Sequence, residues 1–345
     1  MKRVELVDYG KLELRTYPDR ESGLLPGMVR VNVSACGICG SDIALFKGKR
    51  SLKDEKYFGH EFSGVVIDAG AGANGIKAGV RVASELSRTC GQCWNCLNGL
   101  QNYCKSMNEA LLPGGFSEKT QVLNTPEYSF ISQLPDEIDD ITATLLEPTN
   151  CSYRVARQAN ITPGDHVVIF GLGAIGLITA RILKSLGAGV VIGVDTSEKR
   201  LKKVRQLGFL EAVNRNDVDW LEQIKEIGGT KGVDVVIEAT GVVSVLSDAF
   251  DAVRPGGKVV VASVYHGGAG NLELLAIMRK ELKIIGAKGP YPHRNTDGTS
   301  ASLETLVRLQ DDLKKLITVY QYEEAIQAFE DMISGDVIKA VIQFK

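Results

Sequence analysis

The chain has 345 residues, enough to bury two sizeable cores, and its formal charge of −2 gives no field to hold nucleic acid or an anionic membrane surface. No apolar run approaches the roughly 20 residues of a membrane span. Residues 1–5 are not followed by the apolar run of a signal peptide, so we expect a cytoplasmic protein.

Residues 1–150 are rich in short β-like runs separated by glycine turns, for example residues 29–33 and 62–67. Several short strands with frequent turn signals predict a partly open barrel or a sandwich. This stretch therefore forms the first expected domain.

A loose set of metal-ligating residues lies in this domain. Cys36-Gly37-Ile38-Cys39-Gly40-Ser41-Asp42 precedes Gly59-His60-Glu61, and Leu146-Glu147-Pro148 follows much later. One thiolate, one imidazole and one carboxylate with an exchangeable position would form a catalytic zinc site. The alternatives are a redox pair of Cys36 and Cys39, a structural His60, and a Glu147 that caps the next segment.

A tighter cluster has the spacing C-x2-C-x2-C-x7-C and consists of Cys90, Cys93, Cys96 and Cys104. Four thiolates this close can complete a tetrahedral shell, for which zinc is the usual ion. Such a closed site shapes a lobe of chain, about residues 88–106, and takes no part in chemistry. An iron–sulfur cluster and two disulfides are the alternatives, although disulfides are rare in the cytosol.

A glycine motif follows an apolar run at residues 167–170. It reads Gly171-Leu172-Gly173-Ala174-Ile175-Gly176, opens a helical run to about residue 186, and is followed by a second apolar run that ends at Asp195. This order is the fingerprint of a dinucleotide-binding βαβ unit, in which the pyrophosphate lies at the helix N-terminus. A glycine-rich turn kept for packing alone is the alternative.

Asp195 lies nineteen residues beyond Gly176, where a carboxylate can accept both ribose hydroxyls. Because it would repel a 2′-phosphate, we expect NAD(H) rather than NADP(H). The basic residues Lys199, Arg200, Lys202 and Lys203 either soften this preference or form the solvated face of the next helix. Arg200 and Thr240 complete the candidate cofactor-binding set.

Residues 151–290 alternate apolar strands and helices. Strands are predicted at 167–170, 190–194, 211–213, 234–238, 258–263 and 283–286, with helices that include 198–207 and 245–253. This alternation predicts an α/β fold with a doubly wound parallel sheet. Residues 291–345 contain a polar loop, a predicted helix at 322–333 and a final strand at 340–344. They are too few to fold alone, so we expect them to return to the first domain.

The motifs, in this order, resemble the zinc-dependent medium-chain dehydrogenase/reductases, such as sorbitol, threonine and other polyol dehydrogenases. The resemblance covers essentially the whole chain. It is carried by Cys39-Gly40-Ser41-Asp42, Gly59-His60-Glu61, the four cysteines, residues 114–118, Leu146-Glu147-Pro148, the glycine motif, residues 233–241 and Arg254-Pro255-Gly256-Gly257. It implies a GroES-like catalytic domain from 1–150 and 291–345, a Rossmann domain at 151–290, an active site in the cleft between them, and a homodimer or homotetramer.

The resemblance also implies the roles of the site residues. Cys39, His60 and a carboxylate, either Glu61 or Glu147, would hold the catalytic zinc, and the four cysteines a structural zinc. The ion would lower the pKa of the substrate hydroxyl, and a hydride would pass to C4 of the nicotinamide. Ser41 would take part in the first proton transfer; its alternative role is a turn cap.

The chain departs from the family pattern in two places. Many relatives place a histidine two residues after the aspartate that corresponds to Asp42, whereas this chain has Ala44, so the proton must leave through Ser41, the nicotinamide ribose and water, or another group. Cys151 replaces a small aliphatic residue and is either a buried hydrophobe or a thiol at the cleft. The loop after the sixth predicted strand, in contrast, is placed where some polyol dehydrogenases supply an arginine to the substrate, so Arg294 and His293 are either substrate contacts or solvated loop residues.

We therefore expect an NAD-dependent zinc dehydrogenase that oxidises a secondary alcohol of a polyol, cyclitol or aminocyclitol. One alternative is a threonine dehydrogenase-like enzyme acting on a β-hydroxy amino acid. Another is a non-catalytic nucleotide-binding redox sensor, which would hold one zinc per chain where the enzyme would hold two.

Overall fold

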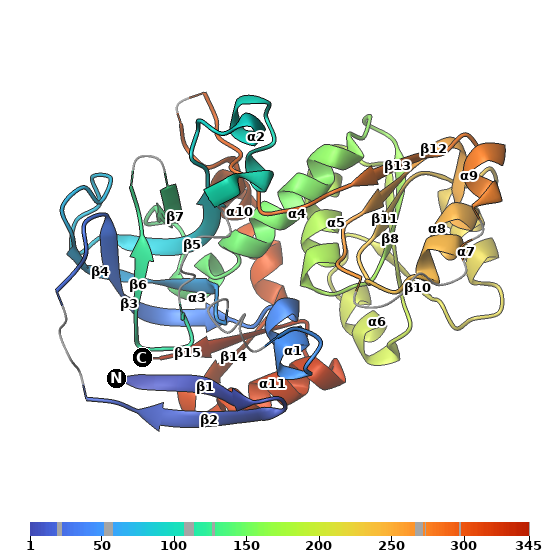
Figure 1. The fold of residues 1–345 in the computed structure, drawn as a ribbon. Coiled ribbons are helices and arrows are strands. Elements are labelled where there is room, and N and C mark those ends of the chain that lie inside the picture. Colours follow the sequence, from blue (N-terminus) through green and yellow to red (C-terminus); the bar gives the residue numbers. More distant parts are fainter. Residues whose placement is uncertain are drawn as a thin grey trace. The chain divides into compact units, whose positions relative to one another are not determined.

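The computed structural model describes residues 1–18, 23–51, 58–106, 114–125, 128–265, 272, 274–296 and 298–344. The chain forms two compact units, coloured along the sequence in Figure 1. The first comprises Met1–Asn150, Pro290–Gln310 and Leu316–Lys345, and the second comprises Cys151–Gly289 and Asp311–Lys315.

The first unit is built mainly from strands. They are β1 (Lys2–Asp8), β2 (Lys11–Thr16), β3 (Met28–Gly37), β4 (Glu61–Ala69), β5 (Arg81–Arg88), β6 (Lys119–Leu123), β7 (Tyr128–Gln133), β14 (Ile317–Gln321) and β15 (Lys339–Gln343). Strands β1 and β2 form a hairpin, and the main sheet has the order β14-β15-β3-β4-β5-β7, with β6 also paired to β3. The expected β-rich domain is thus observed.

The register of β3 brings distant parts of the chain together. In its antiparallel ladders, Gly37 lies opposite Glu61 on β4 and Val341 on β15. The end of β3 therefore lies between the start of β4 and the last strand of the chain.

Helices occupy the connections of this unit. They are α1 (Gly40–Phe46), α2 (Trp94–Leu97), α3 (Asp140–Ala143), α11 (Ala325–Ser334) and the short 3-10 turns Gln101–Tyr103 and Tyr322–Glu324. Two further helices, α4 (Leu146–Ala159) and α10 (Ala301–Leu313), begin in the first unit and end in the second.

The expectation of a polar loop after residue 290 was incomplete, because α10 and β14 form there. In α10 the apolar residues Leu306, Leu309 and Leu313 are buried, whereas Arg308 and Asp311 are exposed. This spacing is that of an amphipathic helix. The polar residues that precede it obscured the pattern.

Aromatic side chains fill the centre of the first core. Phe329 of α11 lies with its ring centroid 5.6 Å from those of both Phe58 and Phe116, and the latter two are 4.7 Å apart. Phe329 is fully buried because Ala325 and Ala328 line the same helix face. Gly335, in the left-handed conformation at φ 79°, ends the helix.

The second unit is a parallel sheet with the order β10-β9-β8-β11-β12-β13. This order confirms the predicted doubly wound Rossmann fold. The strands are β8 (His166–Phe170), β9 (Val190–Asp195), β10 (Glu211–Asn214), β11 (Val233–Glu238), β12 (Val253–Val261) and β13 (Lys283–Gly286). The helices are α5 (Ala174–Ser185), α6 (Glu198–Arg205), α7 (Trp220–Gly228), α8 (Val245–Ala252) and α9 (Leu275–Arg279).

The strand predicted at 258–263 was wrong at both ends, because β12 begins at Val253 and ends at Val261. Its ladder with β11 is irregular: Val233 pairs with Val253, but Val235 pairs with Lys258. The residues Pro255, Gly256 and Gly257 have the composition of a turn, yet they lie inside this irregular strand.

No helix in the described ranges is both long and apolar enough to cross a bilayer.

Phe329→Ala tests the aromatic core. We expect a loss of about 3–5 kcal/mol in the free energy of unfolding, because a large buried side chain is replaced by a cavity. Urea denaturation measures it. Ile326→Ala on the same helix is the control, since Ile326 is 42% exposed and should change stability much less. Equal losses in the two variants would contradict this description of the core.

Candidate active site and metal centres

Two groups of side chains in the described part of the chain can each hold a metal ion. The first consists of Cys39, His60 and Glu61, whose ligand atoms all lie within 4.8 Å of one another. Cys39 precedes α1 as its N-cap, Glu61 is the first residue of β4, and His60 immediately precedes that strand. The predicted thiol, imidazole and carboxylate are thus brought together.

Asp42 holds the two segments of this group in place. Its carboxylate accepts hydrogen bonds from the backbone N–H of Cys39 (2.9 Å) and of Gly59 (3.3 Å), and it lies 3.8 Å from Nδ1 of His60. Burial raises the pKa of Asp42 to about 6, although the neighbouring His60 opposes this shift. Asp42 therefore links the N-cap of α1 to the turn before β4.

Glu61 forms a buried ion pair with Lys339 of β15, the side chains being 1% and 2% exposed. The Lys339 ammonium also donates to the carbonyl oxygen of Ile38 at 3.0 Å. Gly37 faces this pair: a Cβ there would lie 2.6 Å from Glu61 Oε2 and 3.0 Å from Lys339 Cε. The close approach of the ion pair to β3 thus requires a glycine.

Glu147 is 5% exposed, stands in the first turn of α4 and is not one of the three grouped ligands. Its charge nevertheless acts on the group. Burial lowers the pKa of His60, but the charges of Cys39, Asp42 and Glu147 outweigh it and hold that pKa well above its usual range. Ser41, half-buried in the first turn of α1, lies two residues after Cys39.

This donor set suits zinc, which binds thiolate, imidazole and carboxylate together. Cys39 and His60 would hold the ion with Glu61 or Glu147. Excess negative charge surrounds the imidazole, and a bound cation would compensate it.

The second group contains Cys90, Cys93, Cys96 and Cys104. The Sγ atoms of Cys93 and Cys96 are 3.5 Å apart, and those of Cys90 and Cys96 are 3.9 Å apart. Four sulfurs bound to one zinc at about 2.3 Å would be separated by about 3.8 Å. The lobe therefore has the dimensions of a closed four-thiolate site.

Backbone N–H groups favour the thiolate form of Cys93, whereas burial raises the pKa of Cys96 to about 12. Hydrogen bonds from the backbone of Lys105 and Cys96 lower the pKa of Cys93 to about 6. Each of the seven cysteines lies within the described ranges and carries a free thiol, so the structure contains neither the disulfides nor a Cys36–Cys39 bond.

The glycine motif forms the turn between β8 and α5. Gly171 has φ 93°, and a Cβ there would lie 2.8 Å from the carbonyl oxygen of Ala239; at Gly176 a Cβ would lie 2.0 Å from the carbonyl oxygen of Gly171. Gly173, the N-cap of α5, faces open space. Leu172 is buried, and Ala174 and Ile175 begin the helix. An anion can thus approach the backbone at Gly173.

Asp195 ends β9 beside this turn. Its carboxylate accepts hydrogen bonds from the N–H of Leu172 (2.9 Å) and of Ser197 (3.0 Å), and from the Arg200 guanidinium (2.9 Å). Burial raises the pKa of Asp195, but Arg200 and these N–H groups reverse the effect, so the pKa is lowered. Arg200 therefore contacts Asp195, whereas Lys199, Lys202 and Lys203 are exposed.

Thr240 follows β11, next to the glycine turn. Its N–H and hydroxyl donate to Glu238, and its Cγ2 would lie 3.0 Å from a Cβ at Gly171. Glu238 also accepts from the Tyr265 hydroxyl. The buried Glu238 thus organises the loop that carries Thr240.

The two candidate substrate residues lie in the first unit. Arg294 Nη1 contacts Glu85 at 3.1 Å, and its side chain is 32% exposed. The ring of His293 lies 4.4 Å from that of Tyr291. Cys151, half-buried in the second unit, packs against Gly289, where a Cβ would lie 2.9 Å from its Sγ.

Comparisons with known proteins agree with this architecture. Residues 25–136 match the alcohol dehydrogenase GroES-like domain, and residues 174–303 match the zinc-binding dehydrogenase domain. A protein named "Probable D-xylulose reductase A" from Neosartorya fischeri is 34% identical over 344 residues, which cover 96% of this chain and 93% of the relative. The chain belongs to the zinc-dependent medium-chain dehydrogenase/reductase family. The expected family, fold class and enzyme class are thereby confirmed.

Other relatives of the dehydrogenase support the same conclusion. Sorbitol dehydrogenase from Halalkalibacterium halodurans is 29% identical over 316 residues, covering 91% of each chain. The crystal structure of 2R,3R-butanediol dehydrogenase from Bacillus subtilis superimposes with a TM-score of 0.81 at 27% identity, covering 100% of this chain and 99% of that one.

Sequence reasoning missed several residues that surround the sites of the dehydrogenase, above all Lys339, Glu85 and Glu238. Lys339 stands among Ile338, Ala340 and Val341, and a cation in so apolar a strand was the available signal. Its partner could not be read from the sequence, because Glu61 lies 278 residues away.

Lys339→Met tests the ion pair. In chelator-treated protein we expect a loss of about 3–5 kcal/mol in the free energy of unfolding, because the buried Glu61 carboxylate keeps its charge without a partner. Adding Glu61→Gln should recover most of that loss. Lys11→Met removes an exposed ion pair with Glu13 and serves as control. If the double variant were no more stable than Lys339→Met, the unpaired charge would not be the cause.

Proposed function

We propose that this dehydrogenase uses NAD and zinc to oxidise a secondary alcohol of a polyol, cyclitol or aminocyclitol to a ketone. The observation that carries the proposal is the convergence of Cys39, His60 and Glu61 within 4.8 Å. These donors suit a zinc ion that keeps an exchangeable position.

The substrate class is supported by the relatives. Two relatives are named for xylulose and sorbitol, and one of the similar crystal structures is named for butanediol. All three names denote neutral molecules with several oxygens. No feature of the described residues favours a β-hydroxy amino acid over them.

When bound, zinc supplies a Lewis acid for the substrate oxygen, and NAD supplies a nicotinamide that accepts hydride. Cys39, His60 and either Glu61 or Glu147 would hold the metal. Ser41 would accept the substrate hydroxyl's proton and pass it to the cofactor ribose or water, since Ala44 is buried and has no proton-carrying group. Arg294 and His293 would contact the remaining hydroxyls.

The cofactor preference rests on Asp195. It stands at the end of β9 beside the open face of Gly173, where its carboxylate would accept the ribose hydroxyls and repel a 2′-phosphate. Arg200 forms an ion pair with Asp195, and this pairing makes Arg200 less able to attract a 2′-phosphate. Gly171, Leu172, Gly173, Ala174, Ile175 and Gly176 would surround the pyrophosphate, and Thr240 would border it.

We further propose two zinc ions per chain and a homodimer or homotetramer. The second zinc would be held by the four cysteines and would be structural. The oligomer is supported by β13, the last strand in the order of its sheet, where Ile284 is 43% exposed.

Cys39→Ser tests the catalytic metal. We expect oxidation of a polyol and cyclitol panel with NAD to be lost, and bound zinc to fall from two to one per chain, because one ligand is removed while the four-cysteine lobe is intact. Metal analysis and NADH absorbance measure the two effects, and Cys151→Ser is the control. One zinc per wild-type chain would favour the nucleotide-binding sensor. Turnover that persists after chelation would reject the proposal, and so would turnover of threonine alone.

Asp195→Ala tests the cofactor. We expect the ratio of kcat/KM for NADP to that for NAD to rise at least about tenfold, because the repulsive carboxylate is lost and Arg200 becomes available to a 2′-phosphate. Steady-state kinetics with both cofactors measure the ratio. Lys199→Ala, on the exposed face of α6, should leave it unaltered. A wild-type preference for NADP would overturn this assignment.

A further inference from the structure

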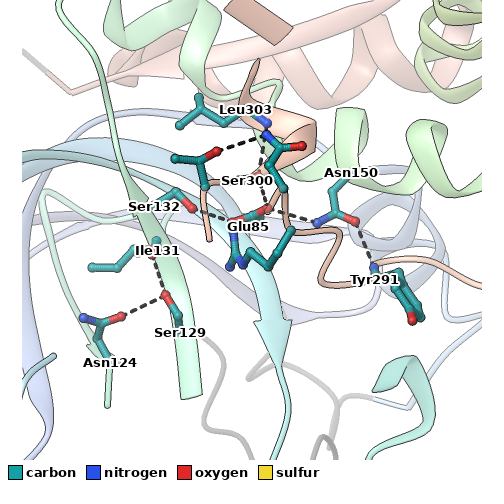
Figure 2. Close-up of polar contacts among 12 residues, drawn as sticks. Glu85, Asn124, Ser129, Ile131, Ser132, Asn150, Tyr291, Ser300 and Leu303 are labelled. Carbon is teal, nitrogen blue, oxygen red and sulfur yellow. Dashed lines mark hydrogen bonds and ion pairs between the residues drawn. The ribbon is translucent and has the colours of Figure 1, made fainter. Parts of the chain in front are cut away.

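Glu85 of β5 is a buried carboxylate with four side-chain donors. Its side chain is 1% exposed, and it accepts hydrogen bonds from the hydroxyls of Ser132 and Ser300, from Asn150 Nδ2 (3.4 Å) and from Arg294 Nη1 (3.1 Å). Figure 2 shows Ser132, Ser300 and Asn150 converging on it. An ionised carboxylate is an acceptor only, and this environment matches that form.

Glu85 is next in sequence to one residue, and is bonded to another, that stand close to the metal-ligating residues. Ser84, its neighbour in β5, donates its hydroxyl proton to the carbonyl oxygen of His60. Asn150 stands three residues after Glu147, about one turn along α4. Glu85 therefore belongs to the surroundings of the metal group.

The same network holds the segment that carries Arg294. Asn150 Oδ1 accepts the N–H of Tyr291 at 2.8 Å, as Figure 2 shows, and the Tyr291 hydroxyl donates to the carbonyl oxygen of Gly99 at 3.0 Å. Ser300 bonds both Glu85 and the N–H of Leu303 at the start of α10. Tyr291 and Ser300, on either side of Arg294 in the sequence, are thus both attached to one polar cluster.

The charge of Arg294 is compensated within this cluster. A guanidinium has five N–H donors, and one of those of Arg294, on Nη1, contacts Glu85. The side chain remains 32% exposed and can donate to a substrate oxygen, while the Glu85 carboxylate offsets its positive charge. Arg294 would therefore bind hydroxyls well and phosphate or carboxylate groups poorly.

We propose that Glu85 determines specificity by neutralising Arg294, so that the site accepts neutral polyols and disfavours phosphorylated or carboxylated ones. This inference rests on the proposed contact between Arg294 and substrate. Glu85 itself is a positioning residue, since it acts through Arg294. The negative charge of Glu85 thus disfavours the binding of anionic substrates.

Glu85→Gln tests the proposal, because the amide keeps the shape of the side chain and removes its charge. With sorbitol as substrate at saturating NAD, we expect the Ki of inorganic phosphate as a competitor to fall about tenfold and the KM for sorbitol to rise. Calorimetric titration of phosphate into the NADH complex reports the same change without turnover. Adding Arg294→Gln should abolish the gain.

Glu85→Asp is the matched control. It keeps the charge and shortens the reach, so the KM for sorbitol should rise while phosphate affinity stays within about twofold of wild type. If the role of Glu85 were purely structural, Glu85→Gln and Glu85→Asp would change phosphate affinity in the same way. Equal phosphate affinity in wild type, Glu85→Gln and Glu85→Asp would overturn the proposal.

Arg294→Gln keeps the test decisive if Glu85→Gln fails to fold. The remaining Glu85 charge should weaken phosphate binding several-fold, and unaltered binding would reject the inference. If Arg294→Gln leaves the KM for sorbitol unchanged, Arg294 is not a substrate contact and the inference fails with it. If the wild type oxidises no polyol, the proposed function fails, while the calorimetric comparison still decides whether Glu85 controls anion binding.

Discussion

The balance of buried charge around Glu61 is the constraint on which the first unit depends. His60, Asp42, Glu61, Glu147 and Lys339 are all buried, and isolated charges in such surroundings cost several kcal/mol each. Lys339 compensates Glu61, and Asp42 faces His60. The sheet makes room for the ion pair of Glu61 and Lys339. The register of β3 places Gly37 beside this pair, where any side chain would collide with it.

Two layers of polar contacts surround the candidate ligands. Asp42 and Lys339 touch the ligand-bearing segments directly, whereas Glu85 and Asn150 bond Arg294, Ser300 and Tyr291. A rigid outer layer of this kind defines the orientation of the inner one. Tyr291, Arg294 and Ser300 therefore belong to one hydrogen-bonded cluster around Glu85 and Asn150.

The sequence predicted features whose residues lie close together in it. The four cysteines fall within fifteen residues, and the glycine motif with its flanking strands forms one local unit, so spacing alone indicated a metal lobe and a Rossmann fold. Cys39, His60 and Glu147 are spread more widely in the sequence, so their residue types suggested a zinc site but left alternatives open, and the family resemblance assigned their roles. The actual proximity of Cys39 and His60 is a property of the sheet.

Interactions that depend on tertiary structure could not be predicted in this way. Nothing in the sequence relates Glu85 to Arg294, which lies 209 residues later. Helix α10 was not predicted, because the polar residues before it suggested a loop. The irregular ladder of β12 likewise arises from its neighbour β11 and not from its own residues. The role of a buried polar group depends on its partners, and these partners are brought together only when the chain folds.

The place of Lys339 in β15 has a consequence for biosynthesis. A ribosome completes the segments that contain Cys39, His60 and Glu61 long before it makes the lysine, which is separated from Glu61 by 278 positions. Until β15 emerges and joins β3, the nascent chain lacks both the edge partner and the counter-charge of the metal group. The group of Cys39, His60 and Glu61 therefore gains its full set of buried contacts only after nearly the whole chain has been translated.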